Sequence, residues 1–178
     1  MKQIISIICM LPFVASAQVV KLEGAKVHQY KQVGEAKLFL HVYNPDGHKD
    51  SDQKPAIVFF FGGGWNGGTP KQFEPHCQYL SQRGMVAITA EYRVKSRNKT
   101  TPFECVKDGK SAIRWVRANA NKLGVDPSRI AAGGGSAGGH LASLMALTQN
   151  RTEFQPGFET ADTSIQGCVS MYGVYEFS

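Results

Sequence analysis

From Ile57 onward, the chain alternates continuous apolar runs with segments of helical length. The predicted strands are Ile57–Phe61, Val86–Tyr92, Ile130–Gly133 and Gln166–Tyr172. The predicted helices are Lys71–Arg83, Thr101–Leu123 and Ala137–Gln149. Strands without polar alternation are typical of a parallel sheet that is buried on both faces, and helices between such strands indicate right-handed crossovers. The pattern therefore predicts an α/β fold with a mostly parallel central sheet.

Two local signals refine this picture. Val27–Gln32 and Lys37–Tyr43 are strand-like runs joined at Gly34-Glu35, which predicts an antiparallel hairpin. Thr101-Pro102-Phe103-Glu104 has the spacing of a capping box, with proline at the first helical position. A helix is therefore expected to begin at Pro102.

The N-terminal segment has the pattern of a signal peptide. Lys2 gives a positive start, Ile4–Val14 is apolar, and Ala15-Ser16-Ala17 supplies small residues for cleavage. The apolar run is shorter than the roughly 20 residues of a membrane-spanning helix, so no stable membrane anchor is expected. We predict a signal peptide at 1–17, an exported protein and a mature domain at 18–178.

The charge distribution and the cysteine content bear on whether the protein binds nucleic acid or a metal ion and whether it forms a disulfide. The 20 Lys and Arg residues outnumber 14 Asp and Glu residues, but they are scattered rather than clustered, so no nucleic acid is expected as a partner. Export would permit disulfides, and the sequence leaves open whether Cys77 and Cys105 form one. Cys168, inside an apolar strand, is expected to be a buried thiol. No cysteine pair has metal-ligand spacing, so no metal site is predicted.

Two glycine clusters, Gly62–Gly68 and Gly133–Gly139, directly follow predicted strands. Ligands of open α/β sheets bind beyond the carboxyl ends of the strands, where glycine lets the backbone approach closely. The second cluster contains Gly134-x-Ser136-x-Gly138 between a strand and a helix, which is the context of a nucleophile elbow. The N–H group at the start of the following helix, Ala137, would stabilise an oxyanion formed by attack of Ser136 on a carbonyl.

The same cluster also fits a dinucleotide-binding fingerprint, Gly133-x-Gly135-x-x-Gly138. That reading needs an acidic residue at the end of the next strand, and none is present there. A nucleotide-binding α/β domain is therefore the weaker alternative.

Several segments together resemble the α/β-hydrolase family, in the esterase and lipase branch related to hormone-sensitive lipase and bacterial acetyl esterases. The matching segments are Phe60-Phe61-Gly62-Gly63-Gly64-Trp65, Ala90-Glu91-Tyr92-Arg93, Ser111-Ala112-Ile113-Arg114-Trp115-Val116-Arg117, Asp126-Pro127-Ser128-Arg129-Ile130, Gly134-Gly135-Ser136-Ala137-Gly138-Gly139-His140 and Tyr172-Gly173-Val174-Tyr175. The resemblance implies a three-layer αβα fold, Ser136 as the nucleophile, and an oxyanion hole formed by Gly63, Gly64 and Ala137. It implies no cofactor and a small-molecule ester as substrate, but it does not fix which ester. Trp65 and Gly67-Gly68-Thr69 suggest an open, partly aromatic entrance that is compatible with small acyl esters or acetylated sugars.

Two residues depart from the family pattern. Phe61 stands where the family usually has the histidine of His-Gly-Gly-Gly, so the oxyanion loop needs another support. Gly135 stands where Asp or Glu commonly precedes the nucleophile, which should loosen the elbow.

The triad of this fold runs in the order Ser, acid, His. The only histidine after Ser136 is His140, about one helical turn along, and we expect it to be structural. Nothing in the sequence steers the earlier histidines, His28, His41, His48 and His76, toward Ser136. We therefore expect this chain to be the N-terminal part of a longer carboxylic-ester hydrolase, with the acid and the histidine missing. The alternative is an inactive remnant or binding protein with an open sheet edge.

Overall fold

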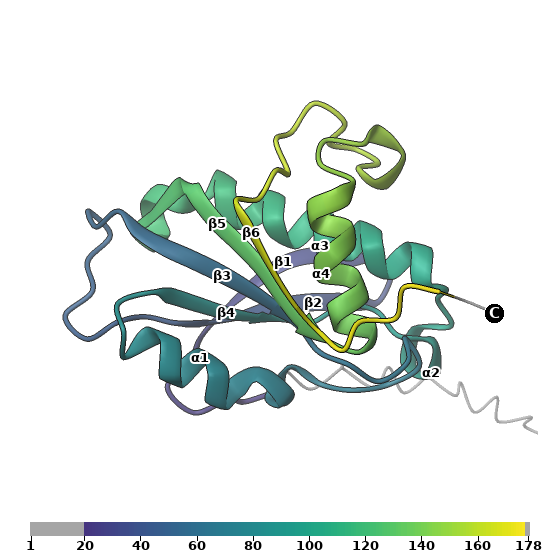
Figure 1. Cartoon of the computed structure of the whole chain (residues 1–178), viewed down its shortest axis with the longest axis horizontal. Coiled ribbons are helices and arrows are strands. Elements are labelled where there is room, and N and C mark those ends of the chain that lie inside the picture. The colour runs from purple at the N-terminus through teal and green to yellow at the C-terminus, as the bar shows by residue number, and fades with distance from the viewer. Residues whose placement is uncertain (1–19, 177–178) are drawn as a thin grey trace, which may run out of the picture.

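The computed structural model describes residues 20–176, so the predicted signal peptide and its cleavage site lie outside the described residues. A six-stranded sheet runs through this part of the chain in the order β1-β2-β4-β3-β5-β6 (Figure 1). Its strands are β1 (Lys26–Val33), β2 (Ala36–Tyr43), β3 (Lys54–Phe60), β4 (Val86–Ala90), β5 (Val125–Gly135) and β6 (Gly167–Met171).

The predicted antiparallel hairpin and the predicted, mostly parallel remainder of the sheet are both confirmed. β1 and β2 form the antiparallel hairpin, and β2 pairs with β4 in antiparallel fashion. β3 is parallel to β4 and β5, and β5 is parallel to β6. β3, β4 and β5 are buried along most of their length, which explains their continuous apolar sequences.

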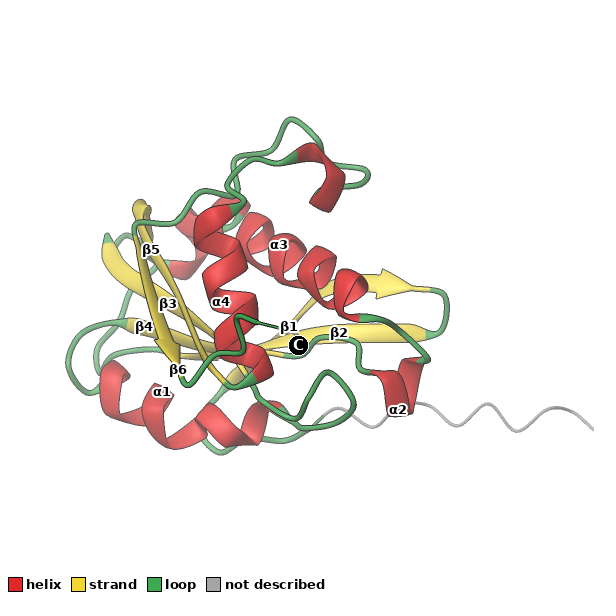
Figure 2. Cartoon of the chain, turned by 45° about the vertical axis from the view of Figure 1, so that its right-hand side comes forward, coloured by secondary structure: helices red, strands yellow, loops and turns green. Residues whose placement is uncertain are grey.

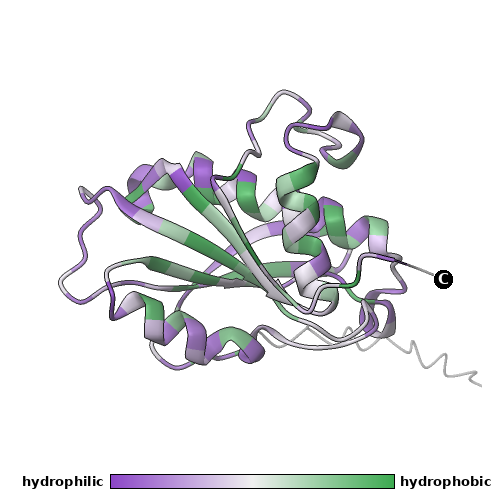
Figure 3. Ribbon diagram, viewed as in Figure 1, coloured by the Kyte–Doolittle hydropathy of each residue, from purple (hydrophilic) through white to green (hydrophobic). Residues whose placement is uncertain are grey.

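Helices cover both faces of the sheet and complete a three-layer αβα arrangement (Figures 1 and 2). The α-helices are α1 (Glu74–Ser81), α2 (Lys95–Asn98), α3 (Pro102–Ala118) and α4 (Ala137–Leu147). Short 3-10 helices lie at η1 (Pro70–Phe73), η2 (Ala120–Leu123) and η3 (Thr152–Phe154). α1 lies on one face, and α3 and α4 lie side by side on the other. All three helices alternate hydrophobic and hydrophilic residues along the chain (Figure 3), and their buried residues include Cys77 of α1, Ile113 of α3 and Leu141 of α4.

The capping box predicted at Thr101 is present at the start of α3. The Thr101 hydroxyl and N–H groups donate to the Glu104 carboxylate at 2.5 and 2.9 Å, and these two hydrogen bonds lower the pKa of Glu104. The helix ends at Ala118, earlier than predicted, and a separate 3-10 turn continues to Leu123. Within the described residues, no helix is both long and apolar enough to cross a membrane.

The cysteine expectations are corrected by the fold. Cys77 on α1 and Cys105 on α3 are both buried free thiols on opposite faces of the sheet, so they form no disulfide. Burial raises the pKa of the Cys105 thiol to about 12. Cys168 is exposed rather than buried, because β6 is an outer strand.

The parallel register decides where the glycine clusters lie. Phe60, the last residue of β3, is aligned with Gly134 near the end of β5. Both strands therefore end at the same edge of the sheet, and the two glycine turns meet there.

Candidate active site

Ser136 is the single residue between the end of β5 and the start of α4. Its φ of 54° lies in the left-handed region, which non-glycine residues seldom occupy. Its N–H group donates to the carbonyl of Met171 at 3.0 Å, which anchors the turn to the end of β6. Ser136 is partly exposed, although Gly135 and Ala137 beside it are buried. Ser136 thus lies at a sharp, partly exposed turn at the carboxyl edge of the sheet, between a strand and a helix as the sequence predicts.

The glycines around this turn permit close backbone packing. A Cβ on Gly134 would overlap the Gly138 carbonyl, and a Cβ on Gly138 would overlap the carbonyl of Phe60. A Cβ on Gly133 would stand 2.6 Å from the ring of Phe59. The glycine spacing that also fits a dinucleotide fingerprint is therefore explained by packing within the protein. Each of these glycines lies against protein atoms.

The loop after β3 lies directly against the elbow. A Cβ on Gly62 would stand 2.8 Å from the Gly135 carbonyl oxygen and 3.3 Å from the Cβ of Ser136. Gly63 and Gly64 follow with φ values of 130° and 60°, which favour glycine. The Gly63 carbonyl accepts hydrogen bonds from the N–H groups of Asn66 and Gly67, which close the loop into a tight turn.

Three N–H groups near the elbow have no backbone acceptor. Among residues 20–176, the N–H groups of Gly63 and Gly64 donate no hydrogen bond. Ala137 is the first residue of α4, and the N–H groups of a first helical turn have no partner within the helix. The positive end of the α4 dipole points toward the same turn. The structure thus places the loop that contains Gly63 and Gly64 beside the turn that carries Ser136, with Gly62 as the point of contact.

The loop is supported without the histidine that the family usually has. The Phe61 ring stacks on Tyr92 with centroids 4.1 Å apart, and the Tyr92 hydroxyl donates to the Phe61 carbonyl at 2.7 Å. Burial raises the pKa of this phenol. Phe61, which stands in place of the family's usual histidine, therefore supports the loop through a buried aromatic pair with Tyr92.

The short helix α2 holds the far part of the same loop. The N–H groups of Lys95 and Ser96 donate to the carbonyls of Trp65 and Asn66. The Arg97 guanidinium donates to the Gly68 carbonyl at 3.0 Å. No motif in the sequence indicated these contacts, since they depend on where α2 lies relative to the loop.

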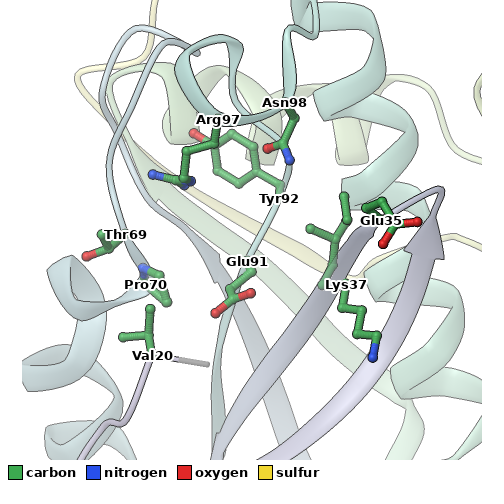
Figure 4. Close-up of a pocket in the computed structure, with 11 residues that line it drawn as sticks. Val20, Glu35, Lys37, Thr69, Pro70, Glu91, Tyr92, Arg97 and Asn98 are labelled. Atoms are coloured by element: carbon green, nitrogen blue, oxygen red, sulfur yellow. The ribbon is translucent and has the colours of Figure 1, made fainter. Parts of the chain in front are cut away.

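A cavity of about 420 Å³ with both apolar and charged lining residues lies beside this support (Figure 4). Arg97, Asn98 and Thr69 line one part of it, and Lys37 of β2 lines another. The Glu91 carboxylate points into the cavity, and one of its oxygens contacts Nε2 of His41 at 3.3 Å. Arg97 therefore lines the cavity and contacts the glycine loop.

The four histidines that precede Ser136 have other neighbours, as the sequence led us to expect. Their contacts are His28 with Trp115, His41 with Glu91, His48 with the Leu123 carbonyl, and His76 with Phe73. His140 on α4 has its Nδ1 atom 2.6 Å from the carbonyl oxygen of Val174. A carbonyl only accepts, so Nδ1 carries the proton. The ring of His140 also lies edge-on to Trp65 at 5.4 Å.

Comparison with known proteins agrees with this architecture. The BD-FAE family profile matches residues 40–178. The chain is 45% identical over 125 residues to "Probable carboxylic ester hydrolase LipM" of Mycobacterium tuberculosis, covering 70% of this chain and 28% of LipM. It is 41% identical over 126 residues to "Esterase LipQ" of the same organism, covering 70% of this chain and 29% of LipQ.

Solved structures agree as well. Thermogutta terrifontis esterase 2 phosphonylated by cyclosarin superposes with a TM-score of 0.84 at 45% identity, covering 89% of this chain and 60% of that protein. The butyrate-bound form of the same esterase superposes with a TM-score of 0.78 at 48% identity, covering 82% of this chain and 52% of that protein. The chain thus spans less than a third of the two curated relatives and little more than half of these solved structures.

With its sheet, its two glycine turns and the match over residues 40–178, the chain belongs to the BD-FAE family, in the esterase and lipase branch of the α/β-hydrolases.

Proposed function

We propose that this chain is the nucleophile-bearing part of a serine carboxylic-ester hydrolase. Ser136 is the nucleophile, and the N–H groups of Gly63, Gly64 and Ala137 form the oxyanion hole. The observation that carries the proposal is the partly exposed serine at a positive-φ turn, with the glycine loop packed against it; the N–H groups of Gly63 and Gly64 in that loop have no acceptor among residues 20–176. The esterase names of the relatives and structural neighbours support the same reaction class.

The chemistry follows from this arrangement. The Ser136 hydroxyl attacks the ester carbonyl, and a base removes its proton as the new C–O bond forms. The carbonyl oxygen becomes negative in the tetrahedral intermediate, where N–H donors stabilise it most. Collapse expels the alcohol and leaves an acyl-enzyme, which water then hydrolyses.

We infer that the triad acid and histidine are not supplied by this chain. Each histidine before Ser136 contacts another part of the fold, and the Nδ1 proton of His140 is held by Val174. Without a positioned base to take the proton as the new C–O bond forms, the Ser136 hydroxyl attacks slowly, and slow turnover follows. The whole hydrolase would need both groups from additional polypeptide.

The substrate we propose is a small-molecule ester with a short acyl chain. Forms of Thermogutta terrifontis esterase 2 are described as propionate-bound and butyrate-bound. Acetylated sugars are esters of the same class, and Glu91, Arg97 and Asn98 in the cavity near the glycine loop could form hydrogen bonds with a hydroxylated alcohol. No cofactor takes part in this proposed mechanism.

The test is labelling of Ser136 by paraoxon, the reagent named for one form of Thermogutta terrifontis esterase 2. Intact-mass analysis after paraoxon treatment should show one diethylphosphoryl group on the wild-type chain and none on Ser136→Ala. Added imidazole should accelerate labelling because it supplies the missing base. Equal labelling of both proteins would disprove the nucleophile assignment. Rapid hydrolysis of p-nitrophenyl acetate that depends on Ser136, without imidazole, would instead show that the chain holds a working base.

We also propose that the protein is exported and that its mature domain is 18–178. The basic start, apolar run and small residues at 1–17 support this. N-terminal sequencing of protein secreted by the native host should begin at Gln18. A mature chain that retains Met1 would contradict the proposal.

A further inference from the structure

Gln72 makes the one side-chain hydrogen bond to an N–H group of Gly62–Gly64 within the described residues. Its side-chain oxygen accepts from the N–H group of Gly62 at 2.5 Å. Gly62 is also the loop residue that packs against Gly135 and Ser136. Gln72 therefore reaches the loop at the point where the loop touches the elbow.

The backbone that carries Gln72 is firmly anchored. Gln72 lies in the 3-10 turn η1 between two buried residues, Pro70 and Phe73. The Phe73 ring stacks on Phe59 of β3 with centroids 4.8 Å apart. Gln72 itself is exposed, so its side chain contributes little to the core. Because the backbone of Gln72 is anchored and its side chain is exposed, Gln72 is suited to position Gly62 rather than to stabilise the core.

Three consecutive glycines would otherwise leave this loop with wide conformational freedom. The hydrogen bond from Gly62 fixes the first peptide of the loop. The next two N–H groups, of Gly63 and Gly64, have no acceptor among residues 20–176. Donors that are fixed before the reaction stabilise a developing negative charge more than donors that must first reorganise.

We propose that Gln72 is a positioning residue for the oxyanion hole. Its side-chain oxygen holds Gly62 and thereby keeps the N–H groups of Gly63 and Gly64 directed toward the substrate oxygen. In the absence of the usual histidine before the glycines, this bond secures the side of the loop nearest Ser136. The inference rests on the proposed function, because it assigns Gln72 to the oxyanion hole of that mechanism.

The experiment compares Gln72→Ala, Gln72→Glu and a control, Gln78→Ala, in the full chain. Glutamate keeps an acceptor oxygen at neutral pH, and alanine removes it. Gln78 is a glutamine on the adjacent helix α1 whose side chain makes no hydrogen bond within the described part of the chain. Three quantities are measured: the hydrogen-exchange rate of the Gly62 amide, the paraoxon phosphorylation rate of Ser136 with imidazole present, and the thermal unfolding midpoint.

In the phosphorylation step the Ser136 oxygen forms a bond to phosphorus, and p-nitrophenolate leaves with the electron pair of the broken P–O bond. Imidazole takes the serine proton, and the phosphoryl oxygen gains negative charge. Gln72→Ala should speed Gly62 exchange and slow phosphorylation by about tenfold each, the size of one lost hydrogen bond. Gln72→Glu should restore both rates, and the unfolding midpoint should match that of Gln78→Ala.

Unchanged Gly62 exchange in Gln72→Ala would overturn the inference, as would wild-type phosphorylation after that exchange has increased. Equal slowing by Gln72→Ala and Gln78→Ala would also overturn it. A wild-type chain that labels no faster than Ser136→Ala is a different failure. It would refute the proposed function, and the positioning role would fall with it.

Discussion

The phenol oxygen of Tyr172 lies 2.6 Å from the point where a Cβ on Gly135 would stand, and two ring carbons lie within 3.0 Å of it. The ring of Tyr172 therefore occupies the space of the side chain that the family commonly places before the nucleophile. Tyr172 has a φ of 42° and is 72% exposed, so it is not held there by burial. Gly135 should not loosen the elbow as the sequence suggested, because a neighbouring ring packs against it.

This relationship predicts that Gly135 and Tyr172 are energetically coupled. Gly135→Ala alone should destabilise the chain by about 1–3 kcal/mol, the usual cost of overpacking. Combined with Tyr172→Ala, the same change should cost much less, since the obstructing ring is gone. Urea unfolding of the wild type, both single variants and the double variant completes the cycle. Additive free energies would contradict the coupling.

A buried ion network predicts a second effect. The Asp108 carboxylate on α3 is fully buried, accepts two hydrogen bonds from the Arg93 guanidinium at 2.8 and 2.9 Å, and contacts the Lys31 ammonium at 2.8 Å. Asp108→Ala leaves two cations without their partner, so we expect a loss of about 3–5 kcal/mol in the free energy of unfolding. Urea denaturation measures it.

Asp126→Ala provides the control for that measurement, because Asp126 pairs with Arg129 near the surface. Exposed pairs contribute little, and its loss should be clearly smaller. Equal losses for the two variants would show that the network around Asp108 adds no stability.

Lys110 predicts a dependence on pH. Its side chain is fully buried and donates to the Thr148 carbonyl at 2.6 Å just past the end of α4, and burial lowers its pKa to about 8. The unfolded chain therefore holds this proton at pH values where the folded chain has lost it, and stability rises with pH in that window. The stability of the wild type minus that of Lys110→Met should be constant below pH 7. It should then rise between pH 8 and about 10.5, the usual lysine pKa. A difference that is flat up to pH 10 would contradict the lowered pKa.

The cysteines give a direct test of the burial pattern. Peptide mapping after brief thiol labelling of the folded chain should find Cys168 modified, and Cys77 and Cys105 protected, as their burial requires. All three should react after unfolding. Protection of Cys168, or a disulfide joining the other two, would contradict the positions reported above.

The two outer strands of the sheet differ in charge. β1 carries Lys26 and Lys31, which are typical of protected sheet edges, whereas β6 carries no charge and exposes Val169 at 49%. Val169 also lines an apolar groove of about 540 Å³ beside α1. We expect Val169→Lys to reduce concentration-dependent self-association in sedimentation velocity. Val33→Lys on the opposite outer strand should have little effect. Equal behaviour of both variants would show that β6 is not the associating edge.

Much of this fold could be predicted from the sequence. The continuous apolar strands between helices predicted the parallel part of the sheet. The hairpin at Gly34 and the helix cap at Thr101 were predictable because each depends only on residues close together in the sequence. The meeting of the two glycine turns was also predictable, because parallel strands end at one edge.

The remaining features depend on contacts between distant segments. Arg97 reaches Gly68 only because the chain returns beside the loop, and even Gln72, ten residues after Gly62, reaches it only through the shape of the turn between them. Tyr172 fills the space at Gly135 for the same reason. The exposure of Cys168 was missed because an apolar strand looks the same at the margin of a sheet as at its centre.

The alignment of Phe60 with Gly134 has a consequence for how this chain folds. The loop at Gly62–Gly64 and the turn at Ser136 are separated by some seventy residues. Neither has its final neighbours until β3 and β5 have paired. If Ser136 is the nucleophile, as proposed, a molecule in which β3 and β5 have not yet paired would not be labelled by paraoxon. The rate at which labelling appears during refolding would then measure the rate at which these two strands pair.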